Sequence, residues 1–289
     1  MAAFCREQTI LTRGSNAQLA VNLYHQLHAT HGWSPQDAWK GIALLLLTCG
    51  VYTGKHMGWQ PFHGAIVYRE SNDFFIKNGK QSGALRKAIR LTSYLESLLG
   101  LSAGTCCQSV GQYWRQPGVS ALQPHNLFGH AFRSIVLEIL QLHGSKAVTY
   151  KEEVSPKQLF AGAPLHLRSK NPAIDIVAFK GNLPVAMISS RWRYRHDRVD
   201  VDAESVAYKS AAMSVGLGAC KFYAMLGEFS PARLEKVLKN TIGVSSNPSI
   251  DGAVHFKPEL ITNPNSIGEN GRTAVLKPLD WLIGETYKW

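Results

Sequence analysis

The stretch AIDIVAFKGNLPVAMISSRW, residues 173–192, decides the fold of this chain. Two apolar runs with strong β propensity flank the sequence KGN, in which glycine and asparagine are typical turn residues. We therefore predict a β-hairpin with strands at 173–179 and 183–192.

Segments on both sides of the hairpin have the patterns of further helices and strands. Upstream, apolar spacing predicts a helix at 131–143, which Gly144 ends, and then a strand at 147–154. Downstream, the predicted elements are a helix at 203–215, a strand at 219–226, a helix from Ser230 to Asn240 and a short strand at 252–256. This alternation predicts an α/β fold, with a mixed central sheet flanked by helices.

The first 120 residues have mostly helical spacing of apolar residues, which predicts a mainly helical region. Helical spacing is found at 17–30, 34–48 and 82–99, whereas His63 to Asn78 is polar and reads as irregular. Two prolines and a glycine between Pro117 and His125 indicate a boundary. The chain thus divides by pattern into residues 1–120 and residues 121–289.

Composition and charge narrow the class of protein. The 289 residues have a formal net charge of +11, which favours a polyanionic partner over the alternative of a basic protein that is merely soluble. Residues 1–16 do not resemble a signal peptide, and the longest apolar run, 42–47, is well short of the roughly 18 residues of a membrane span. The five cysteines form no CxxC pair, so we expect reduced thiols and a cytoplasmic protein. No phosphate-binding GxxxxGK[ST] loop occurs, which argues against ATP-driven chemistry.

The hairpin and the helix after it bring a set of polar side chains together. Because strand side chains alternate, Ser189 and Arg191 share a face, and a natural register places Asp175 beside them. Glu204 begins the next predicted helix. Two carboxylates this close repel each other unless a cation lies between them. Oxygen ligands without Cys or His suit Mg²⁺, so we predict that Asp175 and Glu204 hold this ion, which can activate water at a phosphate.

These residues resemble the active-site motif of the PD-(D/E)XK nuclease superfamily. More narrowly, Asp175, Ser189-x-Arg191 and Glu204 resemble the type II restriction endonucleases that recognise CCGG or CCNGG, in which Ser or Thr replaces the middle acid and a helix glutamate supplies the missing carboxylate. Residues 188–198, ISSRWRYRHDR, are similar to the segment I-S-x-K-W-x-x-R-x-D-R of that branch. Glu138, on the helix before the sheet, resembles an additional helix acid of many such sites, although an acid on an amphipathic helix is usually just solvated.

The resemblance implies a Mg²⁺-dependent restriction endonuclease that cleaves double-stranded DNA and leaves 5′-phosphate and 3′-hydroxyl ends. The catalytic residues implied are Asp175, Ser189, Arg191, Glu204 and Glu138. Residues 121–289 are then the nuclease core, and residues 1–120 a DNA-contacting or dimerisation subdomain. A companion DNA methyltransferase is expected on the same grounds. A palindromic site is met most simply by a homodimer.

Base reading is expected from the residues that follow the hairpin: Arg193, Arg195, Asp197 and Arg198. Arginine can donate two hydrogen bonds to guanine, and aspartate can accept one from cytosine. The resemblance implies that this segment reads the CC/GG part of the recognition site, as it does in the restriction endonucleases that recognise CCGG or CCNGG. The alternative is a basic strand end that contacts phosphates, against which Asp197 counts because an acid does not help a phosphate patch.

Arg191 departs from the family pattern, in which this position is lysine. A lysine can lose its proton and activate water, whereas arginine effectively cannot. Arg191 can still stabilise a charged transition state. The chain is thus an active variant, a weak enzyme or a DNA-binding protein that does not cleave, and a repair nuclease that reads DNA shape is a further alternative. Lys180, in the turn, and Lys209, on the helix after Glu204, are conceivable substitutes for the missing ammonium, but we expect neither to replace it.

Overall fold

The structure is a computed structural model that describes residues 59–62, 65–68, 76–77, 80–81, 124–165, 173–191, 200–228, 231–256, 258 and 276–289. The chain divides into two compact units, residues 1–33 with 39–135 and residues 34–38 with 136–289. The helices predicted at 17–30, 34–48 and 82–99 lie outside the described residues, as does most of the predicted boundary at 117–125. A change of domain at residue 120 stays a prediction.

The first unit contains two short antiparallel ladders. Strand β1 (Trp59–Phe62) pairs with β2 (Ala65–Tyr68), and β3 (Ile76–Lys77) pairs with β4 (Lys80–Gln81). The prediction that His63 to Asn78 is irregular was therefore wrong for β2 and β3. The sequence AIVY of β2 is apolar and rich in β-formers, but it is too short to stand out beside the polar residues after it.

The second unit is built on a six-stranded mixed sheet with the order β10-β9-β8-β7-β6-β5. The strands are β5 (Thr149–Val154), β6 (Ile174–Lys180), β7 (Leu183–Arg191), β8 (Lys221–Leu226), β9 (Gly252–His255) and β10 (Leu276–Pro278). Strands β5, β6 and β7 pair antiparallel, and β7, β8, β9 and β10 pair parallel. The predicted α/β class with a mixed central sheet is confirmed.

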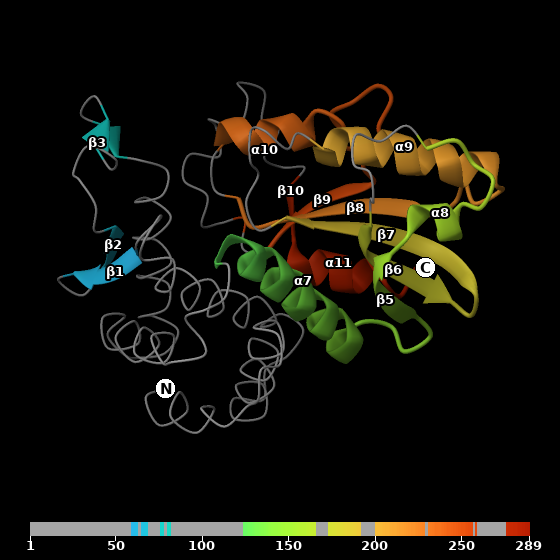
Figure 1. Cartoon of the computed structure of the whole chain (residues 1–289), viewed down its shortest axis with the longest axis horizontal. Coiled ribbons are helices and arrows are strands. Elements are labelled where there is room, and N and C mark those ends of the chain that lie inside the picture. The colour runs from blue at the N-terminus through green and yellow to red at the C-terminus, as the bar shows by residue number, and fades with distance from the viewer. Residues whose placement is uncertain are drawn as a thin grey trace. The chain divides into compact units, whose positions relative to one another are not determined.

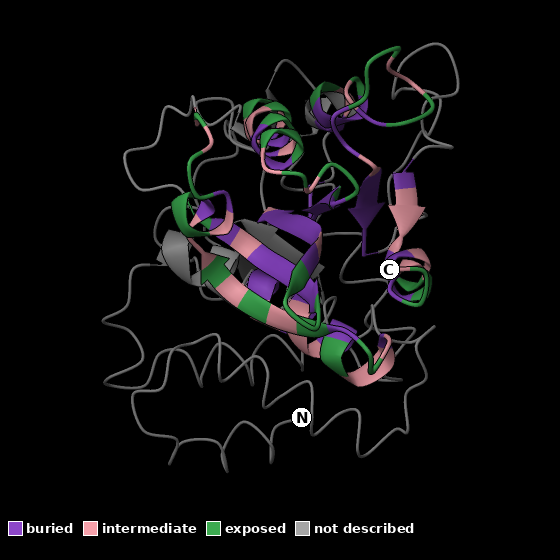
Figure 2. Ribbon diagram, turned by 90° about the vertical axis from the view of Figure 1, so that its right-hand side faces the viewer, coloured by how far each residue is buried: buried purple, intermediate pink, exposed green. Residues whose placement is uncertain are grey.

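Helices cover both faces of this sheet, as Figure 1 shows: α9 and α10 lie along one face, and α7 and α11 along the other. The helices are α7 (Pro124–His143), α8 (Pro156–Leu159), α9 (Asp200–Ser214), α10 (Pro231–Leu238) and α11 (Leu279–Glu285). The inner strands are buried almost throughout, whereas edge strand β5 alternates between exposed and half-buried residues (Figure 2). Within the described part of the chain, no helix combines the length and apolar character that crossing a bilayer requires.

Three features differ from the sequence-based expectation. Helix α7 begins earlier than residue 131, at Pro124, a residue suited to the first turn of a helix. Its end at His143, directly before Gly144, is as predicted, and the Gly144 N–H closes the last turn by donating to the Leu140 carbonyl at 2.8 Å. The short helix α8 and the pair β10 and α11 were not predicted.

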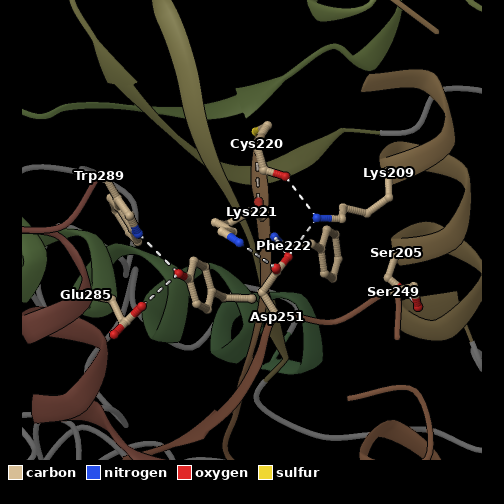
Figure 3. A network of polar contacts seen from close by, with 10 residues as sticks. Ser205, Lys209, Cys220, Lys221, Phe222, Ser249, Asp251, Glu285 and Trp289 are labelled. Carbon is tan, nitrogen blue, oxygen red and sulfur yellow. Dashed lines mark hydrogen bonds and ion pairs between the residues drawn. The ribbon is translucent and has the colours of Figure 1, made fainter. Parts of the chain in front are cut away.

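Helix α9 is tied to the sheet through Asp251, which lies directly before β9 (Figure 3). One of its carboxylate oxygens accepts from Lys209 Nζ at 2.9 Å and from the Phe222 N–H at 2.8 Å. The other lies 3.2 Å from Lys221 Nζ. Lys209 also donates to the Cys220 carbonyl at 3.1 Å. These contacts fix α9 along β8 and thereby set the position of Glu204 on the same helix.

Gly252 provides a test of the packing between β9 and α11. A Cβ atom there would lie 2.7 Å from the Trp281 ring and 3.1 Å from Tyr223, so we expect Gly252→Ala to lower the free energy of unfolding by about 1–3 kcal/mol through overpacking. The matched control is Gly284→Ala in α11, where no atom lies within 4 Å of the added carbon. It should be neutral or gain up to about 1 kcal/mol. Urea denaturation measures the free energy of unfolding of both variants. Equal effects would contradict the close contact of Gly252 with Trp281 and Tyr223.

Candidate active site

The β6–β7 hairpin brings the predicted polar side chains to one place. Its turn contains Gly181 with a φ of 60°, a left-handed conformation that favours glycine. Ile176 pairs with Ile188, so the next antiparallel step sets Asp175 opposite Ser189. Asp175 thus lies beside Ser189 as expected, and the pairing reaches this register through a shift between Ala178 and Phe179.

Asp175 is held by the strand that it faces. Its Oδ2 accepts a hydrogen bond from the Ser190 backbone N–H at 2.8 Å and lies 3.5 Å from Ser189 Oγ. The same Ser189 hydroxyl lies 3.4 Å from Glu204 Oε2. A carboxylate from β6 and a carboxylate from α9 thus reach one buried hydroxyl, which has a single proton to donate.

Arg191 lies between the two acids as their counter-charge. Its Nη2 donates to both oxygens of Glu204, at 2.8 and 2.7 Å, and its Nη1 lies 3.6 Å from Asp175 Oδ2. The Arg191 side chain is 33% exposed, and each acid side chain is 17% exposed. Two neighbouring carboxylates require a positive charge between them, and the guanidinium of Arg191 supplies this charge.

Electrostatics keeps this arginine charged. Burial lowers the pKa of Arg191, but the negative charges of Asp175 and Glu204 and the hydrogen bonds to Glu204 outweigh burial, so the pKa is raised. A guanidinium that holds its proton this firmly cannot accept one from water. Arg191 is suited to binding an anion or to stabilising negative charge.

The remaining predicted residues are Glu138 and the four residues expected to read bases. Glu138 lies half-buried on α7, a helix on the opposite face of the sheet from α9. The four residues expected to read bases, Arg193, Arg195, Asp197 and Arg198, lie outside the described residues.

Both lysines weighed as substitutes are engaged away from the acids. Lys180 donates to the Trp289 carbonyl at 2.8 Å, and Lys209 binds Asp251.

Tyr208 is a residue of the site that sequence reasoning missed. It follows Glu204 by one turn of α9, and it interacts electrostatically with Glu204, Arg191 and Asp175. Its side chain is 1% exposed. The only signal in the sequence was this four-residue spacing, which a core tyrosine on an amphipathic helix shares.

The donor set fits Mg²⁺ in its chemistry. Asp175, Glu204 and Ser189 present oxygen atoms, the ligands that this ion prefers. Across the described ranges, no cluster of three or more His, Cys, Asp or Glu residues suited to a metal is found. Both Glu204 oxygens accept from Arg191, so a bound ion must share this carboxylate with the guanidinium or displace it.

No family model and no curated protein matches the chain. Among solved structures, the chain is similar to the restriction endonuclease PspGI in a complex with substrate DNA, at 14% sequence identity and a TM-score of 0.34, over 71% of this chain and 72% of that one. So low a TM-score gives no ground for transferring a property from that protein.

The role of Arg191 as counter-charge can be measured. Arg191→Met removes the guanidinium that pairs with two largely buried carboxylates, so we expect a loss of about 2–4 kcal/mol in the free energy of unfolding at neutral pH. The control is Lys221→Met, which removes a half-exposed lysine from Asp251. Because Asp251 keeps its ion pair with Lys209, the loss in the free energy of unfolding should stay below about 1 kcal/mol. Denaturation in urea compares the two variants. Similar small losses from both would mean that Arg191 does not neutralise the acids.

Proposed function

We infer that this protein is a DNA endonuclease whose active site consists of Asp175, Ser189, Arg191 and Glu204. The observation that carries the inference is the convergence of a β6 carboxylate and an α9 carboxylate on Ser189 and Arg191. Such a pair of acids beside a cationic donor is suited to binding a divalent ion and a phosphate together. The net charge of +11 supports a polyanionic partner.

Each residue has a role in this proposal. Asp175 and Glu204 would hold Mg²⁺, and Ser189 lies between them in the position of the displaced acid. The bound ion would supply an activated water and neutralise charge at the scissile phosphate. Arg191, anchored on β7, would stabilise the negative charge that develops on the phosphate oxygens. Glu138 is proposed only as an accessory acid.

The finer proposal is a type II restriction endonuclease acting on double-stranded DNA that contains CCGG or CCNGG. It relies on residues 188–198, which begin in β7 and continue beyond it into the proposed base-reading residues. A homodimer, each copy cutting one strand of a palindrome, and a companion methyltransferase belong to the same proposal. The cysteine pattern supports a cytoplasmic location.

The second candidate is a DNA-binding protein of the same fold that does not cleave. The observation in its favour is that Arg191 already occupies both oxygens of Glu204 and cannot act as a base. In this case the guanidinium replaces the metal, and the site binds a phosphate without hydrolysing it.

A plasmid cleavage assay with Mg²⁺ separates the two candidates. We expect discrete fragments from the protein and from Arg191→Lys, and none from Glu204→Gln, which lacks the carboxylate charge but retains its size. Fragments from Arg191→Lys alone would establish the second candidate. Nicking without site preference would replace the restriction enzyme with a nuclease that reads DNA shape. No cutting by any variant, together with no DNA binding, would rule out both candidates.

Base reading predicts a separate pattern in binding. Arg195→Ala and Arg198→Ala should each weaken binding to the specific duplex by about 1–3 kcal/mol, and to random duplex by much less. Fluorescence anisotropy at fixed salt measures both. The control Lys151→Ala changes an exposed cation on β5 and should have little effect on either duplex. Equal losses on the two duplexes from the arginine variants would make them phosphate contacts.

A further inference from the structure

Arg191 lies between the two acids, where an ion that they share would have to bind. Its Nη2 donates to Glu204 Oε1 at 2.8 Å and to Oε2 at 2.7 Å, so one nitrogen contacts both oxygens of this carboxylate. Its Nη1 lies 3.6 Å from Asp175 Oδ2. A divalent ion held by both acids must therefore compete with the guanidinium for the same carboxylate oxygens.

The charges of the site balance only when a divalent ion and an anion are both present. Asp175 and Glu204 carry two negative charges, and Arg191 carries one positive charge, which arginine does not lose. A divalent ion added alone leaves one positive charge in excess, and a phosphodiester added alone leaves two negative charges. Both added together give a net charge of zero. Because each acid side chain is only 17% exposed, an excess charge is poorly screened here, and the balanced state is favoured.

Arg191 is placed where it can meet a phosphate that approaches from solvent. It is the last residue of β7, and its side chain is 33% exposed, compared with 17% for either acid. The guanidinium presents several N–H donors in one plane, which suits it to a phosphate as well as to a carboxylate. A phosphodiester can thus bind Arg191 and draw it away from Glu204.

We propose that the ion pair between Arg191 and Glu204 is an autoinhibitory contact, which keeps a divalent ion out of the site until a phosphodiester draws Arg191 away. The free protein then has a low affinity for Mg²⁺, and duplex DNA raises this affinity. By thermodynamic reciprocity, Mg²⁺ raises the affinity for duplex DNA by the same factor. This regulation rests on the proposed function, since it requires one site to bind both Mg²⁺ and a phosphodiester.

The coupling is measured as the ratio of two dissociation constants for Mg²⁺, one of the free protein and one of the protein saturated with a duplex that lacks CCGG and CCNGG. Isothermal titration calorimetry at constant ionic strength gives both constants, with a titration of the duplex alone as the reference. In the unaltered protein we expect the duplex to lower the dissociation constant about tenfold or more. In Arg191→Met, the free protein should bind Mg²⁺ about tenfold more tightly, and the ratio should fall accordingly, because no guanidinium has to be displaced.

Lys221→Met is the matched control, because it also removes one cation from an ion pair with a carboxylate. Lys221 begins β8 and lies 3.2 Å from Asp251, whereas Arg191 pairs with Leu226 at the other end of that strand. This variant should keep both dissociation constants of the unaltered protein. If Arg191→Met does not fold, Arg191→Gln takes its place, since glutamine keeps an amide donor but has no charge.

The results distinguish the autoinhibitory contact from the proposed function. Mg²⁺ binding by the free protein that neither the duplex nor Arg191→Met strengthens would overturn the autoinhibitory contact and keep the metal site. A ratio that falls equally in Lys221→Met would assign the coupling to net charge and would overturn the contact as well. No binding of Mg²⁺ by the protein or its Arg191 variant, with or without duplex, would reject the proposed nuclease together with the contact.

Discussion

The ion pair between Arg191 and the carboxylates of Asp175 and Glu204 is the constraint on which the site depends. Two acids largely withdrawn from water are costly beside each other, and the guanidinium offsets that cost only while it lies between them. The three residues come from β6, β7 and α9. The hairpin register and the placement of the helix must therefore both be correct before the charges balance.

The sheet and its helices supply that accuracy. Backbone pairing up to Ile176 and Ile188 sets Asp175 opposite Ser189, and the Ser190 N–H holds its carboxylate. The helix is located independently, because Asp251 binds Lys209 of α9 and the backbone of β8 at the same time. Glu204 is thus positioned by contacts more than one helical turn away from its own carboxylate.

Much of this arrangement could be predicted from the sequence, and the physical reasons are local. The hairpin is marked by its turn residues and β-formers, but the register at Asp175 also depends on a shift of the pairing between Ala178 and Phe179, which no residue pattern indicated. The order of the strands in the sheet could not be predicted, because it depends on pairing between segments that are distant in the sequence. Strand β10 was missed because its three residues are too few to form a recognisable pattern. The sequence required a cation between Asp175 and Glu204, but a side chain and a metal ion satisfy that requirement equally well. The structure places Arg191 there.

The two edges of the sheet bear on how copies of this protein can associate. Strand β5 has Lys151, Glu152 and Glu153 in succession, and the positive φ of Glu153, 51°, distorts the strand there. At the other edge, β10 ends in Pro278, which has no N–H to donate. Charges, distortion and proline all discourage the addition of a further strand. Neither edge is suited to a continuous sheet across two copies, so self-association through an extension of this six-stranded sheet is disfavoured.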